Sequence, residues 1–131
     1  MRFRLAAALG VAALIAVSCG GVTDPSNNTV DTFTATLPVG GFNIHPFSAS
    51  NSGEISVIIK ALSPVSSAVL GVIYGLPQSD GSCAAINGSA GSLSSVVFSN
   101  AVQKGSYCLG VYDYFSSLTV PENYTITVSH P

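Results

Sequence analysis

The feature that most constrains the fold is a two-residue alternation of apolar and polar side chains, repeated in short segments from Val30 onward. In residues 31–37, a phenylalanine, an alanine and a leucine fall on one face of an extended chain, and three threonines fall on the other. Segments 106–111 and 123–128 alternate in the same way. No stretch of this region has the 3.6-residue period of an amphipathic helix. The pattern predicts an all-β domain.

Segments rich in Gly, Pro, Ser and Asp interrupt the pattern seven times and so divide it into eight short strands. The predicted breaks are 38–41, 50–53, 63–67, 75–82, 88–91, 104–105 and 113–121. Three segments are apolar on both faces, as is typical of central strands packed on both sides: 55–62, 68–74 and 93–98. Strands of this number and spacing predict one antiparallel two-sheet β-sandwich over residues 30–131, with a barrel as the alternative.

The first 18 residues have the layout of an export signal. A basic start precedes an apolar run from Leu5 to Val17, and small residues follow. As a helix this run would be roughly 20 Å long, whereas the hydrocarbon core of a bilayer is about 30 Å thick, so a permanent membrane span is the weaker interpretation. We therefore expect residues 1–18 to be a signal peptide and the protein to be exported.

Residues 16–19, Ala-Val-Ser-Cys, resemble the lipobox of bacterial lipoproteins. The resemblance implies that Cys19 becomes the first residue, carries lipid and anchors the protein to the bilayer of the cell envelope. Because Gly20 and not Asp follows it, the resemblance favours the outer membrane in a Gram-negative host. Residues 19–29 would form a flexible tether. The alternative is ordinary cleavage nearby, which leaves Cys19 as a free thiol.

The other two cysteines, Cys83 and Cys108, would then lie in an oxidising compartment. A disulfide between them is the natural inference for a small exported domain. It also accounts for the odd number of cysteines, with one as the anchor and two as a pair. Two free buried thiols are the alternative.

The later part of the chain resembles bacterial pre-peptidase C-terminal domains. Segments 42–47 (FNIHPF) and 52–57 (SGEISV) resemble the opening of that family, and 104–113 (KGSYCLGVYD) with 123–128 (NYTITV) resemble its ending. The resemblance implies a jelly-roll-like β-sandwich that has no catalytic activity and is associated with targeting or substrate binding. An immunoglobulin-type sandwich is the alternative fold, but the chain contains no tryptophan to lie between the two cysteines.

The charged and metal-binding residues are few. Beyond the signal segment only Lys60 and Lys104 are basic, so we expect no nucleic-acid partner, which would require clustered positive charge. Two separated histidines and committed cysteines do not supply a zinc site. Asp80 and Asp113, both in predicted loops, are weak candidates for calcium, and no other cofactor is expected.

Catalytic side chains are also scarce. His45 precedes a proline between apolar residues, so we expect a packed or edge histidine, and His130 is the penultimate residue. Glu54 and Glu122 could form a glycosidase pair, but each begins a strand beside a turn, where a solvated carboxylate is ordinary. We expect a protein that is not an enzyme.

The most suggestive cluster is Tyr112-Asp113-Tyr114-Phe115, at the end of a predicted strand. Its rings could stack on sugars or anchor a protein partner while Asp113 accepts hydrogen bonds, and Tyr74 could join them. The favoured interpretation is instead that the loop folds back over the open end of the core with Leu118 and Val120.

The sequence as a whole predicts a lipid-anchored extracytoplasmic β-sandwich that binds or scaffolds. Its partner would be a polysaccharide or an envelope protein. A purely structural cell-surface lipoprotein is the second hypothesis. A small extracytoplasmic hydrolase is the third, and it would require His45 to lie beside a nucleophile and an acid.

Overall fold

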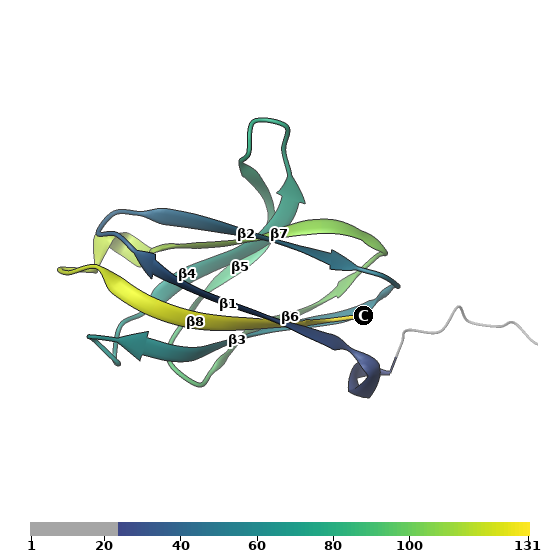
Figure 1. Ribbon diagram of the computed structural model, residues 1–131, viewed down its shortest axis with the longest axis horizontal. Helices are drawn as coiled ribbons and strands as arrows, with labels where there is room; N and C mark the ends of the chain where they lie inside the picture. The colour runs from purple at the N-terminus through teal and green to yellow at the C-terminus, as the bar shows by residue number, and fades with distance from the viewer. Residues whose placement is uncertain (1–23) are drawn as a thin grey trace, which may run out of the picture.

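The alternating segments form two antiparallel four-stranded sheets in the computed structural model, which describes residues 24–131 (Figure 1). The expected signal peptide, Cys19 and the first part of the expected tether, up to residue 23, lie outside these residues. The strands are β1 (Thr29–Leu37), β2 (Phe42–Ala49), β3 (Gly53–Ser63), β4 (Leu70–Pro77), β5 (Cys83–Gly91), β6 (Val96–Val102), β7 (Gly105–Asp113) and β8 (Glu122–His130). Two short 3-10 helices are η1 (Pro25–Asn27) and η2 (Tyr114–Ser116).

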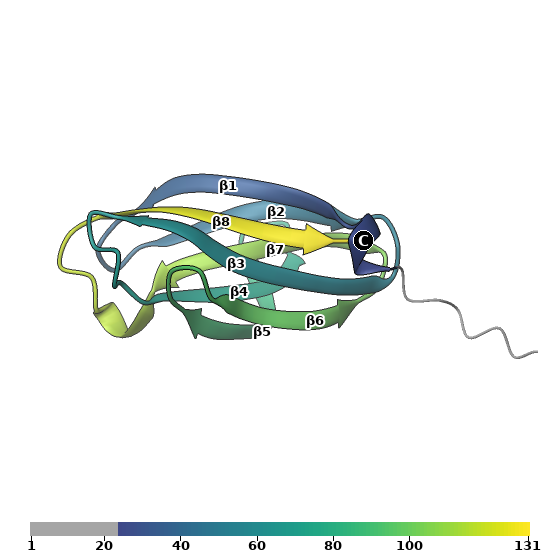
Figure 2. The same ribbon diagram turned by 90° about the horizontal axis from the view of Figure 1, so that it is seen from below.

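The strand order confirms the expected jelly-roll-like sandwich. One sheet has the order β1-β8-β3-β6 and the other β2-β7-β4-β5, so each sheet interleaves strands from the first and second halves of the chain. Every pairing is antiparallel. Figure 1 shows the two layers edge-on, with the β2-β7-β4-β5 sheet above the other, and Figure 2 shows the β1-β8-β3-β6 sheet face-on in front of its partner. In the described residues no helix is long and apolar enough to cross a membrane.

The core fills the space between the two inner faces. Along β8 and the first half of β3 the buried side chains alternate with exposed or half-buried ones, as the two-residue period predicts. Full burial of each Val, Leu or Ile here stabilises the fold by about 1.5–3 kcal/mol. The fully buried side chains of the core are Leu37, Ile55, Val57, Ile59, Leu70, Val72, Leu109, Val111, Tyr124, Ile126 and Val128.

The three segments predicted to be apolar on both faces occupy different positions in the sheets. Segments 55–62 and 68–74 fall largely in β3 and β4, which are central strands as expected. β3 leaves the side chains of its outer face half-buried or exposed, whereas on the outer face of β4 Gly71 and Gly75 are buried and Ile73 is half-buried, so only β4 is covered on both sides. The second half of segment 93–98 begins β6, which is an edge strand, and the first half lies in the preceding turn, so the predicted central strand here is wrong.

The predicted turn at 88–91 is also wrong, because these residues complete β5. Gly88 and Gly91 lie in the strand where a side chain would not fit. A Cβ atom on Gly88 would lie 2.6 Å from Ile73 Cγ2, and one on Gly91 would lie 2.5 Å from Val97 Cγ2. The glycines therefore permit close packing, and the chain turns at 92–95.

The expected disulfide is present between Cys83 on β5 and Cys108 on β7, with a Cα–Cα distance of 5.9 Å. β4 lies between these two strands, and its Gly75 pairs with both Cys108 and Ala85. The side chains of β5 are mostly exposed, so this strand buries little of the core. The disulfide therefore attaches β5, which contributes little to the core, to β7.

The ends of the described chain and three of the connections between strands lie at opposite ends of the sandwich. The start of the described chain and its C-terminus lie at one end, where the Ser50 amide donates to the Pro131 carbonyl at 2.7 Å. The β1–β2, β3–β4 and β7–β8 connections lie at the other end (Figures 1 and 2). The β4–β5 hairpin projects from the side of the body (Figure 1).

Candidate functional site

An open groove of about 420 Å³ lies at the end of the sandwich away from the C-terminus and from the start of the described chain. The β3–β4 connection forms one wall and the β7–β8 connection forms the other. Apolar groups dominate its lining, and none of the lining residues is charged. They are Val65, Ser67, Ala68, Val69, Tyr114, Phe115, Ser117, Leu118, Thr119 and Val120.

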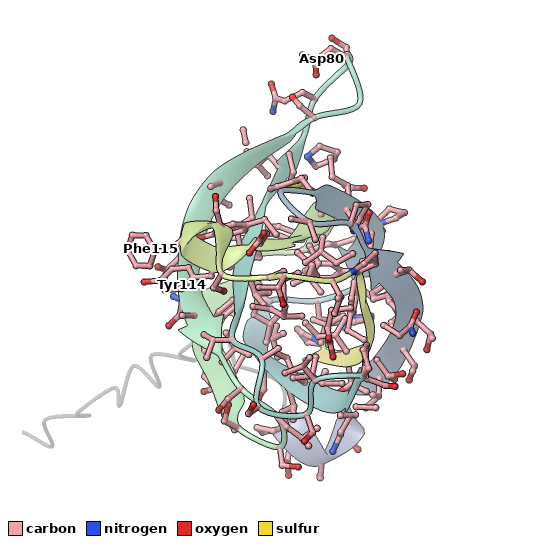
Figure 3. All side chains as sticks on the ribbon, turned by 90° about the vertical axis from the view of Figure 1, so that its left-hand side faces the viewer. Asp80, Tyr114 and Phe115 are labelled. Atoms are coloured by element: carbon pink, nitrogen blue, oxygen red, sulfur yellow. A yellow bond between two sulfur atoms is a disulfide. The ribbon has the colours of Figure 1, made fainter. Side chains whose placement is uncertain are left out.

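Phe115 is the most exposed large hydrophobic residue of the described chain, with 85% of its surface accessible. Its ring lies 4.4 Å from that of Tyr114, centroid to centroid, and it points outward from the groove end (Figure 3). Its backbone is left-handed, with φ 54° and ψ 26°, and Ser116 follows with φ 53°. Such a conformation costs a non-glycine residue about 1–2 kcal/mol. Both the exposure of the ring and the strain of the backbone disfavour stability.

The favoured expectation for this loop is therefore only partly correct. Leu118 is buried and covers the end of the core, as expected. Phe115 and Val120 are exposed and do not. The strained turn at Phe115 directs its ring outward before the chain returns to the core at Leu118.

Asp113 is a structural residue of this site. Only 8% of it is exposed, and its Oδ2 accepts from the Gly40 amide at 2.8 Å while its Oδ1 accepts from the Leu118 amide at 3.0 Å. Burial disfavours ionisation, but the backbone hydrogen bonds from Gly40, Leu118 and Ser117 outweigh it and lower the pKa of the Asp113 carboxyl. The expected role of accepting hydrogen bonds from a ligand is thus replaced by one of holding the loop.

Glu122 holds the other wall of the groove, the β3–β4 connection, as Asp113 holds the β7–β8 connection. The expectation of a solvated carboxylate is wrong, because Glu122 is fully buried and both of its oxygens lie 3.2 Å from the Val65 amide. The hydrogen bond from Val65 fixes the β3–β4 connection to the start of β8. Glu54 is exposed and begins β3 at the other end of the sandwich, so the two glutamates do not form a pair.

Tyr74 does not belong to the groove. Its side chain is buried on the inner face of β4, where it contacts Phe98 at 5.5 Å and Tyr107 at 6.3 Å between ring centroids. Tyr112 lies on the outer face of β7, with its ring 6.3 Å from that of Tyr114. Of the five candidate residues, the structure therefore brings Tyr112, Tyr114 and Phe115 together on the surface.

The two calcium candidates lie apart. Asp80 stands at the tip of the projecting hairpin, far from Tyr114 and Phe115 (Figure 3). Its Oδ1 accepts from the hydroxyl and the amide of Ser82 at 2.6 and 2.9 Å, and these hydrogen bonds lower the pKa of the Asp80 carboxyl. Within residues 24–131 no three His, Cys, Asp or Glu side chains are grouped so as to hold a metal ion.

His45 is a packed edge histidine, as expected. Its ring stacks on Phe33 at 4.7 Å and 13°, and its Nε2 lies 2.7 Å from the hydroxyl of Tyr124. Burial lowers the pKa of His45, which favours the neutral ring. His130 lies at the opposite end from the groove, with its Nε2 3.0 Å from Asp31 Oδ2.

The sequence alone did not reveal the β3–β4 wall of the groove, which contributes Val65, Ser67, Ala68 and Val69. A run of small and apolar residues after Pro64 is its only signal, and that run is equally typical of a loop. Comparison with models of protein families and with curated proteins finds no match to this chain.

Proposed function

We propose that this protein is an exported, lipid-anchored β-sandwich that does no chemistry and binds an uncharged polysaccharide at its groove. The observation that supports this most is the exposure of Phe115, held outward by a strained backbone beside Tyr114. Backbone strain of this kind is typical of functional sites.

The chemistry of the groove suits sugars. Aromatic rings stack on the apolar faces of sugar rings, while hydroxyl groups exchange hydrogen bonds with those of the sugar. Tyr114 and Phe115 supply the rings, and Ser67, Ser117 and Thr119 line the same groove with hydroxyls. Because no lining residue carries a charge, an uncharged chain fits better than an anionic one.

The arrangement of the ends suits a tethered receptor. The described chain begins at the end of the sandwich opposite the groove (Figure 2). A lipid on Cys19 would therefore hold the sandwich with the groove facing away from the bilayer. The lipobox-like residues 16–19 and the resemblance to pre-peptidase C-terminal domains both support an exported binding module over a hydrolase.

A sedimentation assay tests the proposal directly. The full chain, purified in detergent, is incubated with insoluble cellulose, chitin and peptidoglycan, and the bound fraction is measured. We expect retention on cellulose or chitin, and loss of retention when Tyr114 and Phe115 are both changed to Ala. Ile86→Ala, which removes a 52% exposed apolar side chain from β5, should bind like the wild type because Ile86 lies outside the groove. Wild-type protein that is retained by neither cellulose nor chitin would contradict the proposal.

A further inference from the structure

The outer face of the β2-β7-β4-β5 sheet carries two aromatic rings that lie side by side. Phe42 on β2 and Tyr112 on β7 are paired across the two strands. Their ring centroids are 6.1 Å apart and their planes differ by only 17°. Phe42 is 48% exposed although it belongs to a regular strand.

Glycines beneath these rings let them lie close to the sheet. A Cβ atom on Gly71 would lie 2.2 Å from the Tyr112 ring, and one on Gly110 would lie 2.6 Å from the Phe42 ring. Any other residue at either position would push the ring off the sheet. The Tyr112 ring therefore lies over the backbone of Gly71, and the tip of the Phe42 ring lies over Gly110 beside the Ile73 side chain.

The two rings continue the line of rings at the groove. Tyr114 lies 6.3 Å from Tyr112, and Phe115 lies 4.4 Å from Tyr114, between ring centroids. The aromatic track, defined as Phe42, Tyr112, Tyr114 and Phe115, thus runs without a gap from the start of β2 to the groove. None of its members is charged.

We infer that the aromatic track binds several consecutive sugars of one uncharged polysaccharide chain, which passes from the outer face of the sheet into the groove. This inference rests on the proposed function and adds the form of the ligand to it. A site for a chain end or a single sugar needs one or two rings. Four contiguous rings, two of them nearly parallel on a flat sheet, suit an extended polymer with apolar faces that repeat along its length.

The dependence of affinity on ligand length tests the inference. The full chain is titrated calorimetrically with the disaccharide and the hexasaccharide of cellulose and of chitin. We expect the hexasaccharide to bind at least about tenfold more tightly, because it reaches more rings. Phe42→Ala should remove most of this gain and leave the affinity for the disaccharide unchanged. Phe42→Leu, which keeps apolar contact with Gly110 but has no flat ring, should behave like Phe42→Ala.

Each other outcome has a distinct meaning. Ile86→Ala, with a 52% exposed side chain on the same sheet, is the matched control and should keep the full gain. A gain that is unchanged in both Phe42 variants would overturn the track and leave the groove as the site. Failure of the wild type to bind any of the four sugars would overturn the track and the proposed function together. Tighter binding of a polyproline peptide, another extended ligand of aromatic surfaces, would overturn the assignment to a polysaccharide.

Discussion

Asp113 joins three segments at the groove end of the sandwich through one side chain. It terminates β7, accepts from the turn at Gly40 and accepts from Leu118 in the β7–β8 connection. These contacts exist only with a correctly placed acceptor, and they are strongest when the carboxyl is ionised. The β7–β8 connection that carries Phe115 is thus held in place by the charge of Asp113. A ligand in the groove does not need to contact this charge.

This dependence predicts a loss of stability in acid. Because the pKa of Asp113 is lower in the folded protein than in the unfolded chain, the unfolded chain takes up the proton first as the pH falls. The stabilisation is complete above the ordinary pKa of 3.8 and is lost as the pH falls through the lowered value. Urea unfolding at a series of pH values should show a shallower acid loss for Asp113→Asn than for the wild type.

The control for this experiment is Asp80→Asn. The pKa of Asp80 is also lowered, but its partner Ser82 lies within the same exposed hairpin turn. Its acid dependence therefore stays local, and we expect the hairpin variant to follow the wild-type curve more closely. An acid loss as steep in Asp113→Asn as in the wild type would refute the role given to Asp113.

At the scale of elements, the β3–β4 connection is held by a fully buried carboxylate that makes a hydrogen bond with Val65. Glu122→Ala should lower the free energy of unfolding by about 2–4 kcal/mol, because it removes the side-chain partner of the Val65 amide and opens a cavity where the fully buried Glu122 side chain was. Chemical denaturation measures this change. Glu54→Ala, at an exposed position at the start of β3, should stay within about 0.5 kcal/mol of the wild type. Equal effects of the two substitutions would contradict the structural role of Glu122.

The disulfide is the second feature that stabilises a single element, the strand β5. Removing it by Cys83→Ser with Cys108→Ser should lower the free energy of unfolding by roughly 3–4 kcal/mol, on the chain-entropy estimate for a loop of this size. Hydrogen exchange should show the amides of β5 losing protection first, since its side chains bury little. Loss of protection that is uniform over both sheets would mean that the bridge stabilises the sandwich as a whole rather than this strand.

The strands were predictable because the two-residue alternation of apolar and polar side chains depends only on residues that are neighbours in the sequence. The disulfide was predictable from the number of cysteines and the expected compartment. The error at 88–91 arose because a glycine marks a turn and a close packing contact equally well, and only the neighbouring strand decides between them. Tyr74 and Glu122 could not be placed because strand register decides which face, and which end, a side chain occupies.

At the scale of the whole molecule, the start of the described chain and its C-terminus lie at the end of the sandwich opposite the groove (Figure 2). Anchoring at Cys19 therefore predicts a receptor that faces outward. In fractionated cells, Cys19→Ala should move the protein from the membrane pellet to the soluble fraction. The same change should leave sugar binding by the purified protein intact. A variant that stays in the membrane pellet would contradict lipid attachment at Cys19.

The central claim is that Phe115 is kept for binding and not for stability. The most direct measurement combines thermal unfolding and polysaccharide sedimentation on one variant, Phe115→Gly. Glycine tolerates the left-handed backbone at this position, and the ring that it removes is almost fully exposed. We predict an unfolding temperature no lower than that of the wild type together with loss of retention on cellulose or chitin. A lower unfolding temperature with retention unchanged would show that the ring serves the fold, and would contradict the account.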